Sequence, residues 1–158
     1  MSRRVHVQWP SGLLRTRRRA GTGSVPPAAE LRRLLRRAVV ETLITEGVNN
    51  AEVSVTLLGD EDIVKLNRRY LGRDYPPDVL SFALHAAGED PSGDIYIGFD
   101  QALRQAAEHE QTAARELARL AIHGTLHVLG HDHPEGADRI ASAMWTRQEA
   151  ILDRVAAD

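Results

Sequence analysis

The chain of 158 residues contains no cysteine. This absence excludes a disulfide-stapled fold and any metal site built on thiolates, and it makes a reducing compartment, the cytoplasm, the expected location. No uninterrupted apolar run approaches the ~18 residues that a membrane-crossing helix needs. The first residues also lack the apolar core of ~7–15 residues that is typical of a secretory signal. The sequence therefore predicts a globular protein outside the membrane.

Lysine is nearly missing, because Lys65 is the single one among the 20 basic residues. The length and the 42% of apolar residues are ordinary for one domain, expected over residues 1–158. The net charge of −2 hides an asymmetry, since residues 1–40 carry +9 and the remainder −11. Arg15–Arg19 lie in an expected basic loop over residues 10–26. Guanidinium groups bind phosphate well, so this region favours a polyanionic partner; a solvated loop is the alternative interpretation.

Histidine is concentrated in one segment, with four of the seven residues between positions 123 and 133. His123 and His127 are four residues apart, which places them one turn apart on the same face of a helix. Gly130 suits a left-handed helix end, so the chain can turn there and bring His133 back toward them. Three converging imidazoles leave a fourth coordination position open, which is typical of a catalytic zinc site. We therefore predict that His123, His127 and His133 bind one Zn²⁺.

The spacing H-x-x-x-H-x-x-G-x-x-H is also that of the extended zincin protease motif. In those proteases a glutamate follows the first histidine and serves as general base. Gly124 holds that position here, so a peptidase would have its ligands but not its base. His131 is expected to be exposed on the turn. Asp132 is either a turn residue or a carboxylate that orients a ligand imidazole.

Apolar periodicity and turn residues predict an α+β fold. We expect a zincin-like single domain in which helices pack on a small mixed four-stranded sheet. The metal site would lie on a helix in the C-terminal half and on the turn that follows it. Strands are expected at residues 5–9, 53–57, 79–84 and 94–99. Helices are expected at 27–46, 60–70, from residue 100, at 112–129 and at 135–155, with Asp60, Asp100 and Thr112 as N-caps.

The segment HGTLHVLGHDH at residues 123–133 resembles the H-G-x-L-H-L-x-G-[YH]-D-H signature of the YbeY family of bacterial metal-dependent endoribonucleases. Further segments look like the family's L-N…Y-R…P-T-D-V-L-S-F, its G-D-I strand and its C-terminal pattern: Leu66-Asn67…Tyr70, residues 76–82, Gly93-Asp94-Ile95 and Met144…Gln148-Glu149. The resemblance spans roughly residues 50–152.

The resemblance implies a zinc-dependent endoribonuclease that prefers single strands and takes His123, His127 and His133 as its metal ligands. It also implies a role in maturing the 3′ end of small-subunit ribosomal RNA and in ribosome quality control in the cytoplasm. The implied partners are ribosomal RNA and the small ribosomal subunit.

Two positions depart from the family pattern. The family usually has an arginine, held to be functional, directly after the tyrosine of its L-N…Y-R segment, and Leu71 stands here; Pro77 replaces the usual threonine. Nearby arginines are candidates to bind RNA phosphates instead: Arg68, Arg69 and Arg73, with Arg68 and Arg73 also candidates for a catalytic role. If none does so, the loss of one such transition-state contact costs about 3 kcal/mol of barrier.

The general base stays open at this level. Asp132 and Asp78 are candidates, each with a turn or scaffold role as the alternative, and Asp94 is expected mainly to shape a strand entry. Thr125 is expected to face away from the ligands and to pack the helix. Two other functions remain: a metallohydrolase of another substrate class, with a peptidase disfavoured by Gly124, and a non-catalytic, zinc-stabilised ribosome assembly factor, which Leu71 favours.

Overall fold

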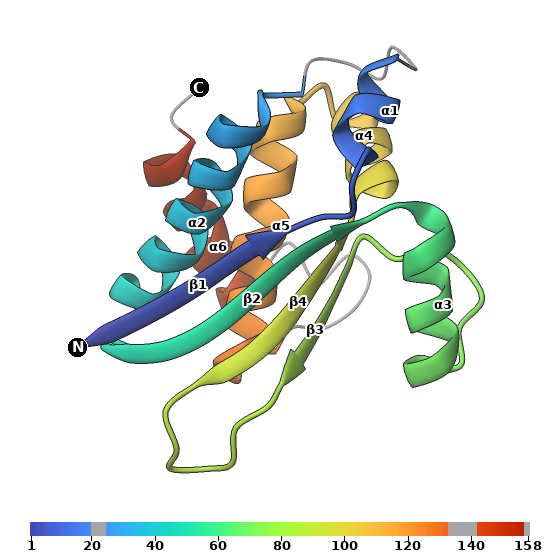
Figure 1. Ribbon diagram of the computed structural model, residues 1–158. Coiled ribbons are helices and arrows are strands. Elements are labelled where there is room, and N and C mark those ends of the chain that lie inside the picture. Colours follow the sequence, from blue (N-terminus) through green and yellow to red (C-terminus); the bar gives the residue numbers. More distant parts are fainter. Residues whose placement is uncertain (20–24, 133–141, 157–158) are drawn as a thin grey trace.

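The structure is a computed structural model that describes residues 1–19, 25–132 and 142–156. The expected α+β fold is confirmed: one mixed four-stranded sheet has α2 and α5 packed on one face, and α6 packs on those two helices (Figure 1). The elements are β1 (Ser2–Gln8), α1 (Leu13–Arg19), α2 (Ala28–Thr45), β2 (Asn50–Leu58), α3 (Asp60–Leu71), β3 (Val79–Ala83), β4 (Ser92–Gly98), α4 (Phe99–Glu108), α5 (Ala113–Val128) and α6 (Ala143–Val155). None of the described helices is long and apolar enough to cross a membrane.

The strand order is β1-β2-β4-β3. β1, β2 and β4 run parallel, whereas β3 pairs antiparallel with β4, from Val79 opposite Ile97 to Ala83 opposite Gly93. β3 is therefore an edge strand, and α5 packs against both β3 and β4. This topology places the histidine helix along the antiparallel edge of the sheet.

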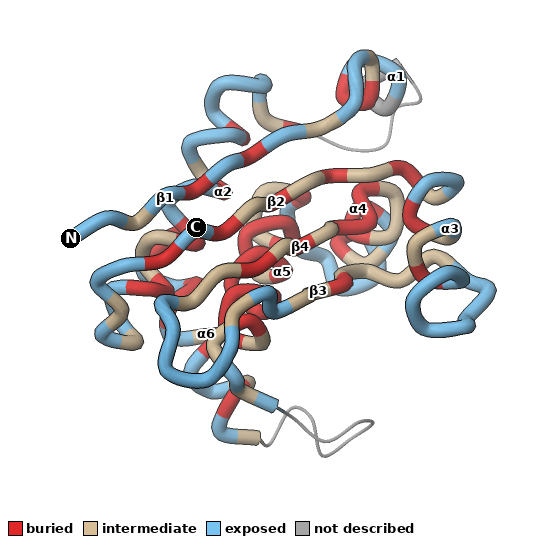
Figure 2. Tube along the Cα trace, turned by 60° about the horizontal axis from the view of Figure 1, so that its bottom comes forward, coloured by how far each residue is buried: buried red, intermediate tan, exposed pale blue. Residues whose placement is uncertain are grey.

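The core lies between the sheet and the helices, where Figure 2 shows the buried residues of both. Every second residue of the central strands is fully buried, as Val53, Val55 and Leu57 are in β2. Alternation of this kind sends one set of side chains into the core and the next set to the other face. Helix α5 is buried on almost every side, which is typical of a helix enclosed by neighbours.

Two glycines set the distance between α5 and the sheet. A Cβ atom added at Gly124 would lie 2.6 Å from Cγ2 of Ile95, and one added at Gly93 would lie 2.6 Å from Cγ2 of Val128. Both distances are too short for real carbon atoms. The helix and β4 therefore approach so closely that neither position accepts a side chain without a shift.

Three details of the predicted elements were wrong. Residues 10–26 are not all loop, since α1 forms there and buries Leu13 and Leu14 in the core. Asp60 and Asp100 are not N-caps, because Gly59 and Gly98 precede the two helices. The helix predicted at 135–155 is not continuous: α6 begins at Ala143, because Ser142 is extended and caps it by accepting a hydrogen bond from Trp145 N–H at 3.1 Å, and residues 135–141 lie outside the described part of the chain.

The displaced caps have a tertiary explanation. The Asp100 carboxylate accepts a hydrogen bond from the backbone N–H of Asp60 at 2.8 Å, so it serves the first turn of α3 rather than its own helix. The predicted cap at Thr112 is confirmed, since its Oγ1 accepts from Arg115 N–H at 3.0 Å. The predicted end of this domain's long N-terminal helix near residue 46 is confirmed as well: α2 ends at Thr45 with Glu46 as its C-cap, and Gly47 follows with a φ of +73°.

Part of the basic charge of residues 1–40 has a structural role. Arg36 on α2 donates to the backbone carbonyl of Val5 at 2.7 Å, and Arg32 donates to that of Val7. These carbonyls belong to β1, an edge strand, and edge strands that keep unpaired backbone groups are open to unwanted pairing. The two arginines therefore protect this edge, so the charge asymmetry alone is weaker support for a polyanionic partner. Arg15 is exposed, and the side chains of residues 17–19 lie outside the described part.

Candidate active site

Two of the three predicted metal ligands meet on one face of α5. Nε2 of His127 lies 3.1 Å from Nε2 of His123, with His123 buried and His127 half-buried. Two imidazoles on a tetrahedral zinc, at Zn–N distances of about 2.0–2.1 Å, hold their nitrogens about 3.3 Å apart. The pair therefore fits two adjacent corners of such a site. His133 lies outside the described residues, and no group of three metal-binding side chains gathers within residues 1–19, 25–132 and 142–156.

The turn predicted after the second histidine is present. Gly130 has a φ of +98°, its N–H donates to His127 O at 3.0 Å, and His131 N–H donates to Leu126 O at 3.0 Å. These two bonds form the Schellman arrangement that ends helices at a left-handed residue. The chain thus turns at Gly130, as the sequence predicted.

His131 is not the exposed turn residue that was expected. It is half-buried, and its Nε2 is hydrogen-bonded to Glu46 at the end of α2, which Arg147 of α6 also contacts at 2.7 Å. Burial acts to raise the pKa of Glu46, but His131 and Arg147 outweigh it, so this pKa lies below its ordinary value. Glu46 therefore ties the turn after α5 to two other helices.

The other nitrogen of His123 is held from α6. Its Nδ1 lies 2.6 Å from Oε1 of Gln148, and both residues are buried. Gln148 Nε2 donates to Glu149 Oε2 at 3.1 Å, and Arg119 of α5 grips the same carboxylate through Nε and Nη2 at 2.9 and 3.0 Å. The motif resemblance pointed at Gln148-Glu149 but gave them no role, and it missed Arg119.

Arg119 also donates to Glu116 at 2.9 Å, one turn earlier on α5. Burial raises the pKa of Glu116, although the charge of Arg119 opposes the shift. Burial alone would lower the pKa of Arg119, but its hydrogen bond to Glu149 and its two carboxylate neighbours raise it. The opposite charges of Glu116 and Arg119, set three residues apart among the apolar residues of α5, are the sequence signal that was available for this network.

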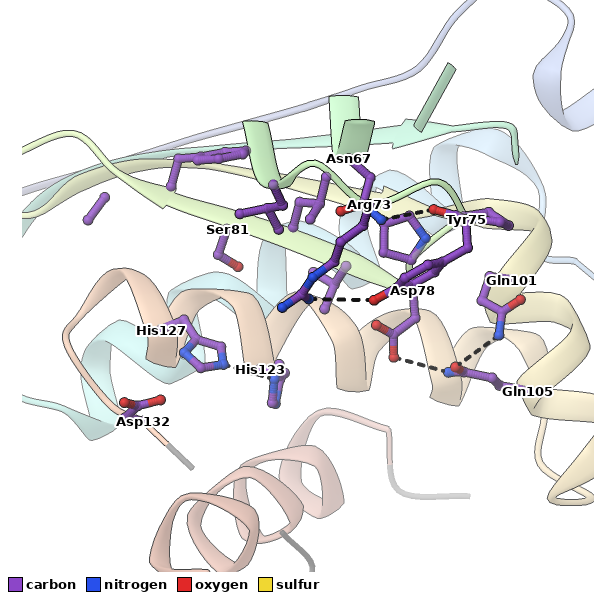
Figure 3. Close-up of a pocket in the computed structure, with 17 residues that line it drawn as sticks. Asn67, Arg73, Tyr75, Asp78, Ser81, Gln101, Gln105, His123, His127 and Asp132 are labelled. Atoms are coloured by element: carbon purple, nitrogen blue, oxygen red, sulfur yellow. Dashed lines mark hydrogen bonds between the residues drawn. The ribbon is translucent and has the colours of Figure 1, made fainter. Parts of the chain in front are cut away.

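A groove of about 750 Å³ opens over the two histidines (Figure 3). The edge strand β3 and the loop before it form one side, and α5 forms the other. The lining residues are Asn67, Leu71, Arg73, residues 75–83, Gln101, Gln105, His123, His127 and Asp132.

Of the three candidate arginines, Arg73 lines this groove and the other two do not. Its guanidinium extends toward α5 in Figure 3, and its Nη1 lies 3.5 Å from the Tyr75 hydroxyl. Arg68 is paired with Asp74 outside the groove, and Arg69 lies over the ring of Tyr70 at 5.4 Å. Arg73 is therefore the candidate that the fold brings toward the histidines.

Asn67 fixes the loop that carries Arg73. Its Nδ2 donates to Tyr75 O at 2.9 Å, and its backbone carbonyl accepts from Arg73 N–H at 3.3 Å. The residue is 1% exposed, so water does not compete for these bonds. A position that the resemblance singled out thus has a clear structural role.

The candidate carboxylates occupy different places. Asp78 lines the groove and its Oδ2 accepts from Gln105 Nε2 at 3.4 Å, while its backbone carbonyl accepts from Gly98 N–H at 2.8 Å. Asp132 is exposed and lies beside His127 past the end of α5 (Figure 3). Asp94 alternates with Ile95 on β4, faces away from α5 and does not line the groove. Thr125 is fully buried and bonds Ala121 O at 2.7 Å, as expected of a packing residue.

Gly124 explains why no protease base is present. Its missing side chain would point at the sheet, 2.6 Å from Ile95 Cγ2 and 3.0 Å from Ser81 Oγ. A glutamate there would collide with β4 rather than reach a substrate. Ser81 Oγ is itself buried, without a hydrogen-bond partner among the described residues.

A mixed sheet whose edge strand and central helix enclose an imidazole-lined groove defines a zincin-like α+β domain. The family model described as Endoribonuclease YbeY matches residues 19–156. The chain is 42% identical over 146 residues to Endoribonuclease YbeY of Bacillus licheniformis, covering 84% of this chain and 89% of that relative. It is 47% identical over 139 residues to Endoribonuclease YbeY of Moorella thermoacetica, covering 80% and 88%.

The solution structure of TM1509 from Thermotoga maritima superimposes with a TM-score of 0.61 at 25% identity, covering 96% of this chain and 88% of that one. The chain belongs to the YbeY endoribonuclease family.

Proposed function

We propose that this protein is a zinc-dependent endoribonuclease that cleaves single-stranded RNA. We further propose that it matures the 3′ end of small-subunit ribosomal RNA and acts in ribosome quality control in the cytoplasm, with ribosomal RNA and the small subunit as partners. The observation that carries the proposal is the convergence of His123 and His127 at 3.1 Å in a groove that Arg73 also lines. Family membership supplies the reaction class.

His123, His127 and His133 would hold the metal. Bound in such a site, zinc lowers the pKa of a coordinated water and shares the charge that develops on a phosphoryl oxygen. The donor set fits zinc, because imidazole is a preferred ligand and the two Nε2 atoms already face each other. No thiolate competes, since the chain has no cysteine.

The remaining lining residues would position the RNA. Arg73 would bind a phosphate beside the cleaved bond, as guanidinium groups do with two parallel hydrogen bonds. Asp78 and Asp132 are carboxylates in the groove that can accept a proton. Gly124, which faces Ile95 and Ser81 of the sheet, supplies no general base of the protease type, so peptide hydrolysis is disfavoured.

The test is His127→Ala assayed on a ribosomal RNA precursor. We expect loss of both zinc retention and cleavage, because one of three ligands is removed. Arg68→Ala is the matched control, since it alters an exposed ion pair outside the groove, and it should keep full activity. Full cleavage by the His127→Ala protein would refute the proposal. Wild-type protein that binds small ribosomal subunits and zinc but cuts no RNA would instead favour the assembly-factor alternative.

A further inference from the structure

The hydrogen bond behind His123 is closed to solvent. His123 is 4% exposed and Gln148 is 1% exposed, and the two are joined across the α5–α6 contact at 2.6 Å. Water cannot replace either partner at such burial, and an unsatisfied buried polar group is costly. The position of the proton between Nδ1 and Oε1 is therefore set by the neighbouring side chains.

The orientation of the Gln148 amide is decided by its neighbour. Glu149 Oε2 lies 3.1 Å from Gln148 Nε2, and a carboxylate only accepts hydrogen bonds. The amide must therefore turn its NH₂ to Glu149 and its oxygen to His123. A flipped amide would set two oxygens against each other.

The acceptor role of Glu149 is in turn fixed by Arg119. Nε and Nη2 of Arg119 reach the two oxygens of Glu149 at 2.9 and 3.0 Å, which is the paired geometry of arginine with a carboxylate. Arginine offers donors only and stays charged, so both oxygens of Glu149 act as acceptors. Arg119 is itself 14% exposed and is anchored on its other side by Glu116.

We propose that Gln148 is a positioning residue that fixes the proton of His123 on Nδ1, and that the Arg119–Glu149 pair fixes Gln148. Arg119, Glu149, Gln148 and His123 form one directed chain of hydrogen bonds. The lone pair of His123 is then left on Nε2, which faces Nε2 of His127. The alternative tautomer would place lone pairs of Nδ1 and Oε1 against each other at 2.6 Å. The part of this inference that concerns zinc rests on the proposed function.

The test compares two arginines that both link α5 to α6. Arg119→Met breaks the chain, whereas Arg115→Met breaks a link to Asp153 and to the Ala156 carbonyl, each at 2.6 Å, that does not contact His123. Gln148→Leu removes the acceptor itself. Zinc dissociation constants come from competition with a chelator, and the His123 tautomer in the metal-free protein comes from long-range ¹H–¹⁵N spectra.

We expect wild-type His123 to carry its proton on Nδ1. Gln148→Leu should mix the tautomers and weaken zinc binding by about 10–100-fold, the usual effect of losing a partner that orients a metal ligand. Arg119→Met should act in the same direction, and Arg115→Met should leave both readouts unchanged. If Gln148→Leu does not fold, Glu149→Gln keeps the shape but lets the amide of Gln148 flip, and it should mix the tautomers too.

Unchanged tautomer and unchanged zinc affinity in a folded Gln148→Leu or Glu149→Gln protein would overturn the inference. Equal effects of Arg115→Met and Arg119→Met would also overturn it. Such a result would mean that both arginines act only by holding α5 against α6. Failure of the proposed function is distinguishable, because a wild-type protein that binds no zinc, or binds zinc and cuts no RNA, still reports the His123 tautomer.

Discussion

Replacing Gly124 by alanine sets two physical effects against each other. Alanine is favoured over glycine in a helix interior by about 1 kcal/mol, so helix propensity alone predicts a more stable protein. The new Cβ would lie 2.6 Å from Cγ2 and 3.2 Å from Cγ1 of Ile95, and 3.0 Å from Ser81 Oγ. Ile95 is fully buried in β4, so it has little room to move. Overpacking of this kind costs about 1–3 kcal/mol and can exceed the gain.

We therefore expect a net loss of up to about 2 kcal/mol in the free energy of unfolding, which for a chain of this size lowers the melting temperature by up to about 8 °C. Urea unfolding of the metal-free protein measures it. Ile95→Ala completes a double-mutant cycle, because it removes the Ile95 atoms that the new Cβ would meet. Gly124→Ala should therefore lower the free energy of unfolding less in the Ile95→Ala background than in the wild type. A Gly124→Ala protein that is more stable than the wild type would show that helix and sheet are not in hard contact here, and the explanation of the missing glutamate would fall with it.

Two further predictions concern the edges of the site. Glu46→Gln should lower stability by about 1–2 kcal/mol at neutral pH through the loss of charged hydrogen bonds to His131 and Arg147. The pKa of Glu46 is lower in the folded protein than its ordinary value of 4.5. The stability that ionised Glu46 contributes is therefore present above pH 4.5 and is lost as the pH falls through the folded pKa. When unfolding is followed against pH, the wild type and the variant should converge in acid. Arg73→Ala should weaken binding of single-stranded RNA and reduce the slope of log K against log salt by about 0.7, the value for one phosphate contact. The same slope measured for Arg68→Ala should stay at the wild-type value.

The elements that sequence patterns predicted well are those with a local cause. The i, i+4 spacing of His123 and His127, the cap at Thr112 and the left-handed turn at Gly130 each depend on residues within one or two turns. Helix α1 was missed because seven residues carry too little periodicity, and the buried pair Leu13-Leu14 is its only apolar anchor.

Features that depend on distant parts of the chain were not predictable in the same way. Glu46 and His131 are 85 residues apart, and His123 and Gln148 are 25 apart. No spacing rule connects them, since their contact is decided by how α2, α5 and α6 pack. The exposed role expected for His131 was wrong for this reason, and the charged pair of Arg119 and Glu116 on an apolar helix was a hint that only the packing of α6 could explain.

The structure shows where the nearest groove-lining arginine lies relative to Leu71, the position that departs from the family pattern. Leu71 is the last residue of α3, and the chain reverses at Gly72, which has a φ of +65°. Leu71 and Arg73 therefore flank one sharp turn, and both line the groove over the histidines. A cation two residues later can reach the same space because the left-handed glycine folds the chain back on itself, with Asn67 holding the loop in place. Leu71 by itself is thus weak support for a protein without catalysis, since Arg73, on the other side of Gly72, brings a positive charge to the groove.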